Sequence, residues 1–274
     1  MRILVFQHVD CEHPGSLRKF LADDGVQWDA IYLHRGDKIP SFDNYDALWV
    51  MGGPMDVWDV EEYPWLIDEK AAIREWVSDL RKPYLGLCLG HQLLADALGG
   101  TCGPQKIPEI GVLEIELTDA GKQDPLFKGT AHSQKCLQWH SVKVAQAPEG
   151  AVILAKSDVC SVQAMRIGEN AWSMQYHVEI EPDTVDNWGA IPEYAEALIN
   201  TLGNDALLGL KKNTDKNIKT GPENKASQAT NAKGFNSLLN GFTRTCPRAH
   251  VADPKIVRPI PISFPSKFGD PVKI

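Results

Sequence analysis

Over the first 100 residues, short apolar runs of strand length alternate with longer segments whose apolar positions recur at helical spacing. The apolar runs predict strands at 2–8, 28–33, 47–51 and 84–87. The helical spacing predicts helices at 15–24 and 65–80, the second with Ile67, Ala71, Ile73 and Val77 on one face. Strands that alternate with helices pair in parallel through crossover connections. The pattern therefore predicts an α/β fold built on a doubly wound, mostly parallel sheet.

From residue 111 onward, the apolar runs lie closer together and are separated by Gly, Pro, Asn and Asp turns, which is typical of antiparallel pairing. They predict further strands at 112–117, 142–145, 152–155, 161–167 and 172–176. We expect these strands to extend the parallel sheet antiparallel on its far side. A helix is predicted next, at 192–202.

The remaining residues are more polar. Residues 211–233 contain one large apolar side chain, Ile218, and predict a long surface loop, which a helix at 235–242 follows. The six prolines of residues 244–274 exclude a regular helix or a central strand there. The predicted organisation is thus a domain at 1–243 followed by a Pro-rich basic tail at 244–274.

The composition is that of a water-soluble globular protein, because 43% of the 274 residues are hydrophobic and 23% are charged. No apolar run approaches the roughly 20 residues of a bilayer-spanning helix. The first residues lack the basic region, long apolar segment and cleavage site of a secretory signal. A cytoplasmic protein without a membrane partner is therefore expected.

The charge is unevenly distributed along the chain. Residues 211–274 carry 12 lysines and arginines against 4 acidic residues, whereas residues 1–210 carry 16 against 32. An acidic body repels nucleic-acid phosphates, and the basic residues of the tail are too scattered for a phosphate-binding arm. No nucleic-acid partner is expected.

Six cysteines occur at irregular spacing without a Cys-x-x-Cys pair, which argues against a disulfide framework or a zinc site. Cys88 differs from the others because it is the centre of a Gly-x-Cys-x-Gly motif at 86–90, between a predicted buried strand and an apolar helical run. This pattern is typical of a nucleophile elbow, in which glycines permit a tight, strained turn at a helix N-terminus. The helix end favours the thiolate, and the backbone N–H of Leu89 becomes a donor for a developing oxyanion.

A thiolate nucleophile requires a base, and His177 is the best placed of the eight histidines. It comes at the end of the predicted strand 172–176, and Glu179 follows two residues later. Residues i and i+2 of an extended chain point to the same side, so we expect Glu179 to orient one ring nitrogen while the other faces Cys88. Glu181 has the same parity and is the alternative orienter.

Three ordered motifs resemble the class I glutamine amidotransferase family: Met-Gly-Gly-Pro at 51–54, Gly-Leu-Cys-Leu-Gly-His-Gln at 86–92 and Gln-Tyr-His-Val-Glu at 175–179. The resemblance spans about residues 1–205 and implies a flavodoxin-like fold. It also implies that a cysteine attacks the side-chain amide of glutamine, forming a γ-glutamyl thioester and releasing ammonia. The family usually has proline between the His and the Glu, where this chain has Val178, but the spacing is unchanged.

The resemblance implies a role for each matching residue. Cys88 is the expected nucleophile, His177 the base and acid, and Glu179 the orienter. Gly53 and Leu89 are expected to supply the two N–H groups of the oxyanion hole.

Four further residues are candidates for substrate contacts. Gly52 precedes Gly53 in a pair that lets bare backbone approach a ligand, and Gln92 lies where the family contacts the bound γ-glutamyl group. His140 and Ser141 lie where family members often contact substrate, although an ordinary surface or loop histidine is the alternative for His140. No metal or cofactor is expected, because no His-x-x-x-His motif or Cys/His cluster with ligand spacing occurs.

The favoured function is a free-standing hydrolase similar to γ-glutamyl peptidases and γ-glutamylamide hydrolases. About 70 residues follow residue 205, without a nucleotide-binding signature, so a fused synthetase domain is not expected. Alternatives are a glutaminase subunit that donates ammonia to a separate synthetase chain, a non-catalytic scaffold subunit, and a cysteine–histidine hydrolase of the amidase or deglycase kind. The small-molecule partner is a γ-glutamyl amide or glutamine. The leaving amine, the role of the tail and the oligomeric state, a homo-oligomer included, are left open.

Overall fold

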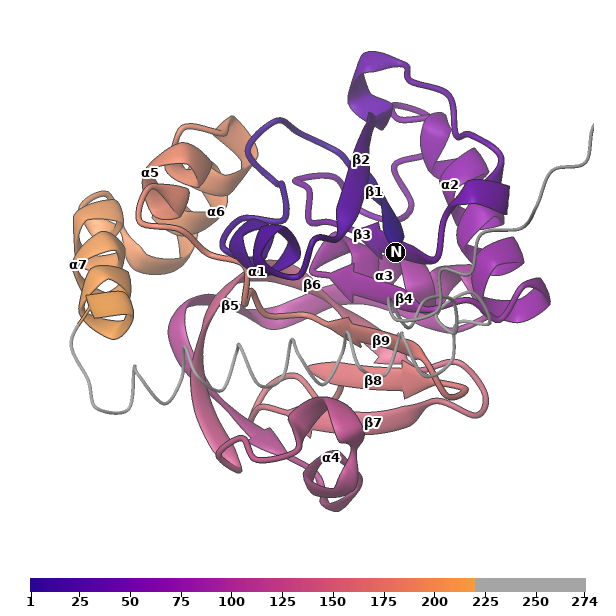
Figure 1. The fold of residues 1–274 in the computed structure, drawn as a ribbon. Coiled ribbons are helices and arrows are strands. Elements are labelled where there is room, and N and C mark those ends of the chain that lie inside the picture. Colours follow the sequence, from indigo (N-terminus) through magenta and orange to yellow (C-terminus); the bar gives the residue numbers. More distant parts are fainter. Residues whose placement is uncertain (220–274) are drawn as a thin grey trace, which may run out of the picture.

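Nine strands form one mixed sheet in the computed structural model, which describes residues 1–219 (Figure 1). The strand order is β2-β1-β3-β4-β9-β8-β7-β5-β6. The parallel half consists of β2 (Gln27–Tyr32), β1 (Arg2–Gln7), β3 (Ala47–Val50), β4 (Tyr84–Leu87) and β9 (Ala171–Met174). This is the strand order of flavodoxin-like folds, so the predicted doubly wound sheet is confirmed.

The parallel strands all end at one edge of the sheet, which is where ligands bind in open α/β folds. The chain leaves β3 directly into Met51 and Gly52, and it leaves β4 directly into Cys88. Beyond β9 it reaches His177. The topology therefore brings the three motifs singled out in the sequence to the same edge.

Four antiparallel strands complete the sheet: β5 (Thr101–Leu117), β6 (Ser133–Gln146), β7 (Val152–Lys156) and β8 (Ala164–Ile167). The expected antiparallel extension is confirmed, but β5 and β6 are much longer than predicted, and β8 begins only at Ala164 instead of residue 161. Pro104 and Pro108 argue against a strand over the first half of β5, because proline cannot donate a hydrogen bond to a neighbouring strand. A register shift between Pro104 and Glu109 accommodates them.

Helices cover both faces of the sheet. Helix α1 (Leu17–Asp23) packs on the face that carries Ile3 and Val5 of β1. Helices α2 (Trp65–Arg74) and α3 (Leu89–Ala97) pack on the opposite face, with Leu4 and Phe6. The alternation along β1 reflects the two-residue period of a strand. Short segments complete this part: α4 (Asp119–Gln123) and 3₁₀ turns at Leu33–Arg35, Phe42–Asn44 and Pro125–Phe127.

The apolar face predicted for α2 was only partly right. Ile73 is buried as expected, but Ile67 is 56% exposed and Ala71 is exposed, whereas Leu66 and Glu69 are buried. The helix then continues into a π-helical turn, Glu75–Asp79. The error arose because a carboxylate occupies a core position, which apolar periodicity counts as polar. A buried glutamate needs a specific partner, and Glu69 has one in the candidate site described below.

Up to residue 219, three helices follow β9 and pack together: α5 (Thr184–Gly189), α6 (Pro192–Leu202) and α7 (Ala206–Lys219) (Figure 1). Their apolar cluster joins Trp188 and Tyr194 to Trp139 of β6. The predicted helix 192–202 is confirmed. Within the described residues, no helix combines the length and the hydropathy that crossing a bilayer requires.

The prediction of a surface loop from residue 211 was wrong for residues 211–219, which continue α7. Leu210 and Thr214 are buried, whereas most side chains between them are exposed or half-buried. Packing along this one narrow face stabilises a helix that is too polar to be recognised by its apolar content. The rest of the predicted loop, the helix predicted at 235–242 and the Pro-rich tail lie outside the described residues.

Candidate active site

Cys88 occupies the strained turn that the Gly-x-Cys-x-Gly motif predicted. Its φ is 50° and its ψ is −105°, in a region that residues with a side chain rarely adopt. Its backbone N–H donates to Met174 O at 2.9 Å, which ties the turn to β9. A Cβ at Gly90 would lie 2.1 Å from Val50 O, so glycine is required there for α3 to approach β3. Strand, turn and helix together hold the thiol at the N-terminus of α3.

His177 and Glu179 form a buried hydrogen-bonded pair next to Cys88. His177 Nδ1 lies 2.7 Å from Glu179 Oε1, and the side chains are 1% and 4% exposed. Burial alone lowers the pKa of His177, but the charges of Glu179 and Cys88 and hydrogen bonds to both hold that pKa well above its ordinary value. The imidazole therefore faces a thiol on one side and a carboxylate on the other, as nucleophilic catalysis by cysteine requires.

Glu179 is the acid that contacts His177, and the alternative orienter lies elsewhere. Glu181 accepts from Arg18 Nη2 at 2.6 Å, in a partly exposed ion pair. The second oxygen of Glu179 accepts from the backbone N–H of Val178 at 2.8 Å. Proline has no N–H, so Val178 gives this chain a contact with Glu179 that the usual family residue cannot make.

The two residues predicted for an oxyanion hole lie on adjacent elements. A Cβ on Gly53 would lie 3.0 Å from Leu89 Cδ2, so the loop after β3 packs against the first residue of α3. The N–H of Leu89 belongs to the first helical turn, where amides have no acceptor within the helix. The role of the two N–H groups as oxyanion donors stays a prediction.

A buried pair that the sequence did not reveal supports this loop. His8 Nδ1 lies 2.7 Å from Gly52 O, and His8 Nε2 lies 2.9 Å from Glu69 Oε1. Burial disfavours the imidazolium, but Glu69, the Gly52 carbonyl and Glu12 together raise the pKa of His8. Because both ring nitrogens face acceptors, His8 fixes the peptide that connects Gly52 to Gly53. The sequence signal that could have identified His8 was its position directly after β1, at the edge of the sheet where ligands bind in such folds.

Gln92 lies behind the thiol in a chain of amides. Its Nε2 donates to Val142 O and to Gln175 Oε1, both at 3.2 Å. Gln175 Nε2 in turn lies 3.7 Å from Cys88 Sγ. Gln175 was missed as a site residue, although it is the first residue of the motif at 175–179.

A family model for class I glutamine amidotransferases matches residues 10–187, which is more than half of the chain. The chain belongs to the class I glutamine amidotransferase family. The resemblance seen in the three sequence motifs is therefore confirmed.

Known proteins are similar to this family member over more than half of its length. The glutamine amidotransferase-like protein YfeJ of Salmonella typhimurium is 29% identical over 209 residues, or 74% of this chain and 85% of YfeJ. One subunit of the glutamine-hydrolysing GMP synthase of Sulfolobus acidocaldarius is 30% identical over 154 residues, which are 56% of this chain and 77% of that protein. A solved glutamine amidotransferase from Thermotoga maritima matches with a TM-score of 0.74 at 24% identity, covering 88% of this chain and 97% of that chain. At this identity the structural likeness shows the fold.

The last two substrate-contact candidates of this amidotransferase separate onto opposite faces of β6. His140 is buried, with Nδ1 2.9 Å from Val142 O and Nε2 3.0 Å from Gln138 Oε1. The interpretation of His140 as an ordinary surface or loop histidine was wrong, because it lies inside a strand and its ring faces the interior. Ser141 is exposed, since successive strand residues point to opposite faces.

One further acid, Glu12, lies within the site and was missed in the sequence. It is 1% exposed, and a ligand atom of Glu12, His177 and Glu179 each lies within 4.8 Å of the others.

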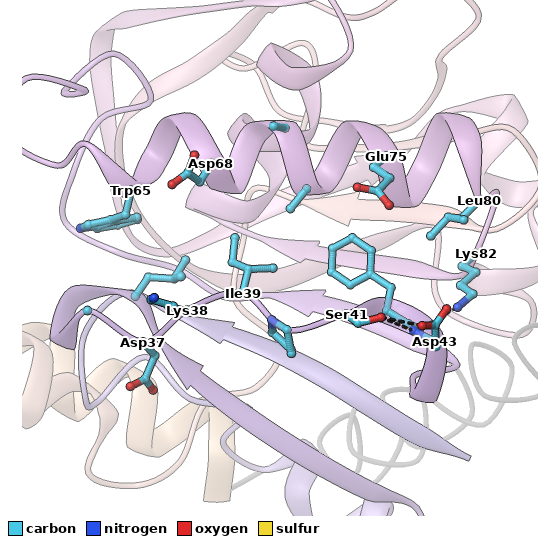
Figure 2. A pocket seen from close by; sticks show the side chains of 16 residues that line it. Asp37, Lys38, Ile39, Ser41, Asp43, Trp65, Asp68, Glu75, Leu80 and Lys82 are labelled. Atoms are coloured by element: carbon cyan, nitrogen blue, oxygen red, sulfur yellow. Dashed lines mark hydrogen bonds between the residues drawn. The ribbon is translucent and has the colours of Figure 1, made fainter.

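A separate groove lies between α2 and residues 33–43 (Figure 2). Figure 2 shows Trp65 and Asp68 on α2 and Glu75 at the start of the π-helical turn, with Lys38 and Ile39 on the facing segment. None of the site residues predicted from the sequence lines this groove. The groove is therefore distinct from the candidate active site.

His91 anchors α3 just behind Cys88. Its Nε2 lies 3.1 Å from Val162 O, which can only accept, so this nitrogen carries the proton. Its Nδ1 lies 2.8 Å from Ser173 Oγ and accepts from that hydroxyl. Burial lowers the pKa of His91 to about 3, so the folded protein holds the ring neutral.

This buried neutral histidine predicts acid sensitivity. Between pH about 6.5 and about 3, the unfolded state binds a proton that folded His91 refuses, so the free energy of unfolding falls as the pH is lowered through this window. We expect His91→Gln to lose less unfolding free energy between pH 7 and pH 4 than the parent protein, measured by urea denaturation at each pH. The exposed His132→Gln is the matched control and should keep the parent slope. Equal slopes for all three proteins would contradict the neutral assignment.

Proposed function

We propose that this amidotransferase-family protein hydrolyses a γ-glutamyl amide bond, with Cys88 as nucleophile, His177 as acid and base, and Glu179 as orienter. The observation that carries the proposal is the His177–Glu179 hydrogen bond of 2.7 Å beside a thiol held in a nucleophile elbow. The products are glutamate and an amine or ammonia.

The first half-reaction forms a thioester. The Cys88 thiolate attacks the γ-carbonyl carbon, and the carbonyl electron pair moves to oxygen, where the N–H groups of Gly53 and Leu89 donate to it. When the carbonyl re-forms, the C–N bond breaks with its electron pair on nitrogen, and the His177 imidazolium supplies the proton for the leaving amine. Glutamate remains bound to Cys88 through its γ-carbon.

The second half-reaction returns the enzyme to its starting state. Neutral His177 takes a proton from water, the resulting hydroxide attacks the thioester carbon, and the C–S bond breaks with its electron pair on sulfur. Free glutamate and the Cys88–His177 thiolate–imidazolium pair are restored. Glu179 stabilises the imidazolium in both halves, and His8 with Glu69 keeps the Gly52–Gly53 peptide in place.

A second candidate function is a glutaminase subunit that donates ammonia to a separate synthetase chain. The observation that favours it is the 30% identity to a subunit of the glutamine-hydrolysing GMP synthase of Sulfolobus acidocaldarius. The chemistry at Cys88 would be the same, with glutamine as the amide. The two functions differ in whether the chain turns over by itself.

The deciding experiment assays the isolated protein against glutamine, γ-glutamyl dipeptides and γ-glutamyl alkylamides, with glutamate release as the readout. We expect steady turnover of at least one amide without a second protein. If no amide in the panel is hydrolysed until a synthetase chain is added, the ammonia-donating subunit replaces the free-standing hydrolase. The panel also identifies the leaving amine.

A further inference from the structure

Glu12 is an unusual carboxylate because it is buried beside the reacting groups with one oxygen unpaired. Its Oε1 accepts from the hydroxyl of Tyr194 at 2.7 Å. Its Oε2 is buried and has no hydrogen-bond partner among the described residues. A Cβ on Gly52 would lie 2.5 Å from that oxygen, so the carboxylate rests on the bare backbone of the loop after β3.

The groups that face Glu12 have no proton left for Oε2. His177 is hydrogen-bonded to Glu179 and interacts electrostatically with Cys88, and His8 is hydrogen-bonded to Gly52 O and to Glu69. The Tyr194 hydroxyl already donates to Oε1. Glu179, the remaining charged neighbour, repels Glu12 instead of pairing with it.

Such a carboxylate is costly unless a cation joins it. Burial raises the pKa of Glu12, and His177, Tyr194 and His8 counteract this effect only in part. A buried, unpaired polar group in a native fold calls for a specific explanation, such as a catalytic role or a bound ion or water. Beside the reacting groups, a substrate group that donates a hydrogen bond would give Oε2 its missing partner.

We propose that Glu12 is the cation-binding group of this site and accepts an ammonium group of the substrate through Oε2. The inference rests on the proposed γ-glutamyl chemistry, which offers two such groups. Every γ-glutamyl compound carries an α-ammonium, and an amide of a diamine carries a second ammonium on its leaving group. Tyr194 acts as a positioning residue, because its bond to Oε1 leaves Oε2, next to Gly52, as the oxygen free to accept. Hydrogen bonds between charged partners are among the stronger ones in proteins.

Two pairs of substrates distinguish the two sources of the ammonium. Comparing hydrolysis of glutamine with that of glutaramate, the same amide without the α-ammonium, tests whether Glu12 binds the glutamyl end. Comparing the γ-glutamyl 2-aminoethylamide with the γ-glutamyl methylamide tests whether Glu12 binds the leaving amine. We expect the parent protein to favour the ammonium-bearing member of one pair in kcat/KM, and Glu12→Gln to reduce that preference by roughly tenfold or more. Glu193→Gln, which removes an exposed acid next to Tyr194, is the control and should leave both ratios unchanged.

Binding provides a readout that does not depend on turnover. In a Cys88→Ala background, we expect calorimetry to show weaker binding of the ammonium-bearing amide when Glu12→Gln is added, and unchanged binding of its partner lacking the ammonium. Equal effects of Glu12→Gln on both members of both pairs, or no effect on any, would overturn the proposal. If the proposed hydrolase function is wrong, the result differs from a failure of the Glu12 proposal. The parent protein would then hydrolyse no amide, while the binding comparison would still show whether Glu12 binds the ammonium group.

Discussion

Hydrolysis of every γ-glutamyl amide is expected to fall by roughly 10³-fold or more in Cys88→Ser. Serine keeps the shape of the side chain, but its hydroxyl does not ionise beside His177 as a thiol does. The strained turn, the contact of the residue 88 N–H with Met174 O and the His177–Glu179 pair do not require sulfur. The measurement is kcat from glutamate release, with circular dichroism and thermal melting to establish that the variant is folded.

A buried cysteine away from the site supplies the control for this loss. Cys160 is also fully buried, and its thiol contacts Val162 O. Cys160→Ser should keep kcat within a few-fold of the parent, because it removes sulfur without touching the reacting groups. A comparable loss of activity in both variants would contradict the assignment of Cys88 as nucleophile.

Alkylation tests the same assignment without substrate. Burial raises the thiol pKa values of the other described cysteines to about 11 or about 12, so they stay protonated at neutral pH: Cys11, Cys102, Cys136 and Cys160. We expect iodoacetamide at pH 7 to label Cys88 before these four, as mapped by peptide mass spectrometry. A Cys88 that reacts no faster than those four would favour the non-catalytic scaffold.

Gly90→Ala is expected to damage stability and activity together. The added Cβ would lie 2.1 Å from Val50 O and 2.8 Å from Val50 C, which belong to the backbone of a fully buried strand and cannot turn aside. Relief requires α3 to move away from β3 and to carry Cys88 and Leu89 with it. We expect a loss of about 1–3 kcal/mol in the free energy of unfolding by urea denaturation. The displaced thiol should reduce kcat by about 100-fold.

The same substitution at an unconstrained helical glycine should have the opposite sign. A Cβ on Gly209 in α7 meets no atom within 4 Å, and the residue is exposed. Gly209→Ala is therefore expected to raise the free energy of unfolding by about 0.4–1 kcal/mol, because alanine loses less backbone entropy on folding. Equal stability changes at the two positions would show that the contact with Val50 does not limit Gly90.

Several features of the site could be predicted because they depend on near neighbours in the chain. The turn at Cys88 needs glycines within two residues. The pairing of His177 with Glu179 needs only their two-residue separation, although the chain bends there, beyond the end of β9, instead of continuing extended. Strands such as 47–51 and 84–87 are continuous apolar runs, as expected for buried parallel strands. These local patterns also carried the resemblance to the family.

Other features left no local signal. Helix α7 is polar over residues 211–219 and is held by a narrow buried face, so composition alone indicated a loop. The first half of β5 contains prolines, which a register shift accommodates only because β6 lies beside it. The sequence predicts that Glu69 is exposed because it is charged. In the structure Glu69 is buried, since its carboxylate pairs with His8, 61 residues away.

The sequence by itself determined the α/β class and the family, and it singled out Cys88, His177 and Glu179 as candidates, because each rests on spacing within a short stretch of chain. Only the tertiary structure decided which groups surround them. Glu12 and Tyr194 are 182 residues apart, and His8 contacts a loop that follows a different strand. Parallel strands bring such residues together at one edge of the sheet, and hydrophobic periodicity carries no information about which strands become neighbours.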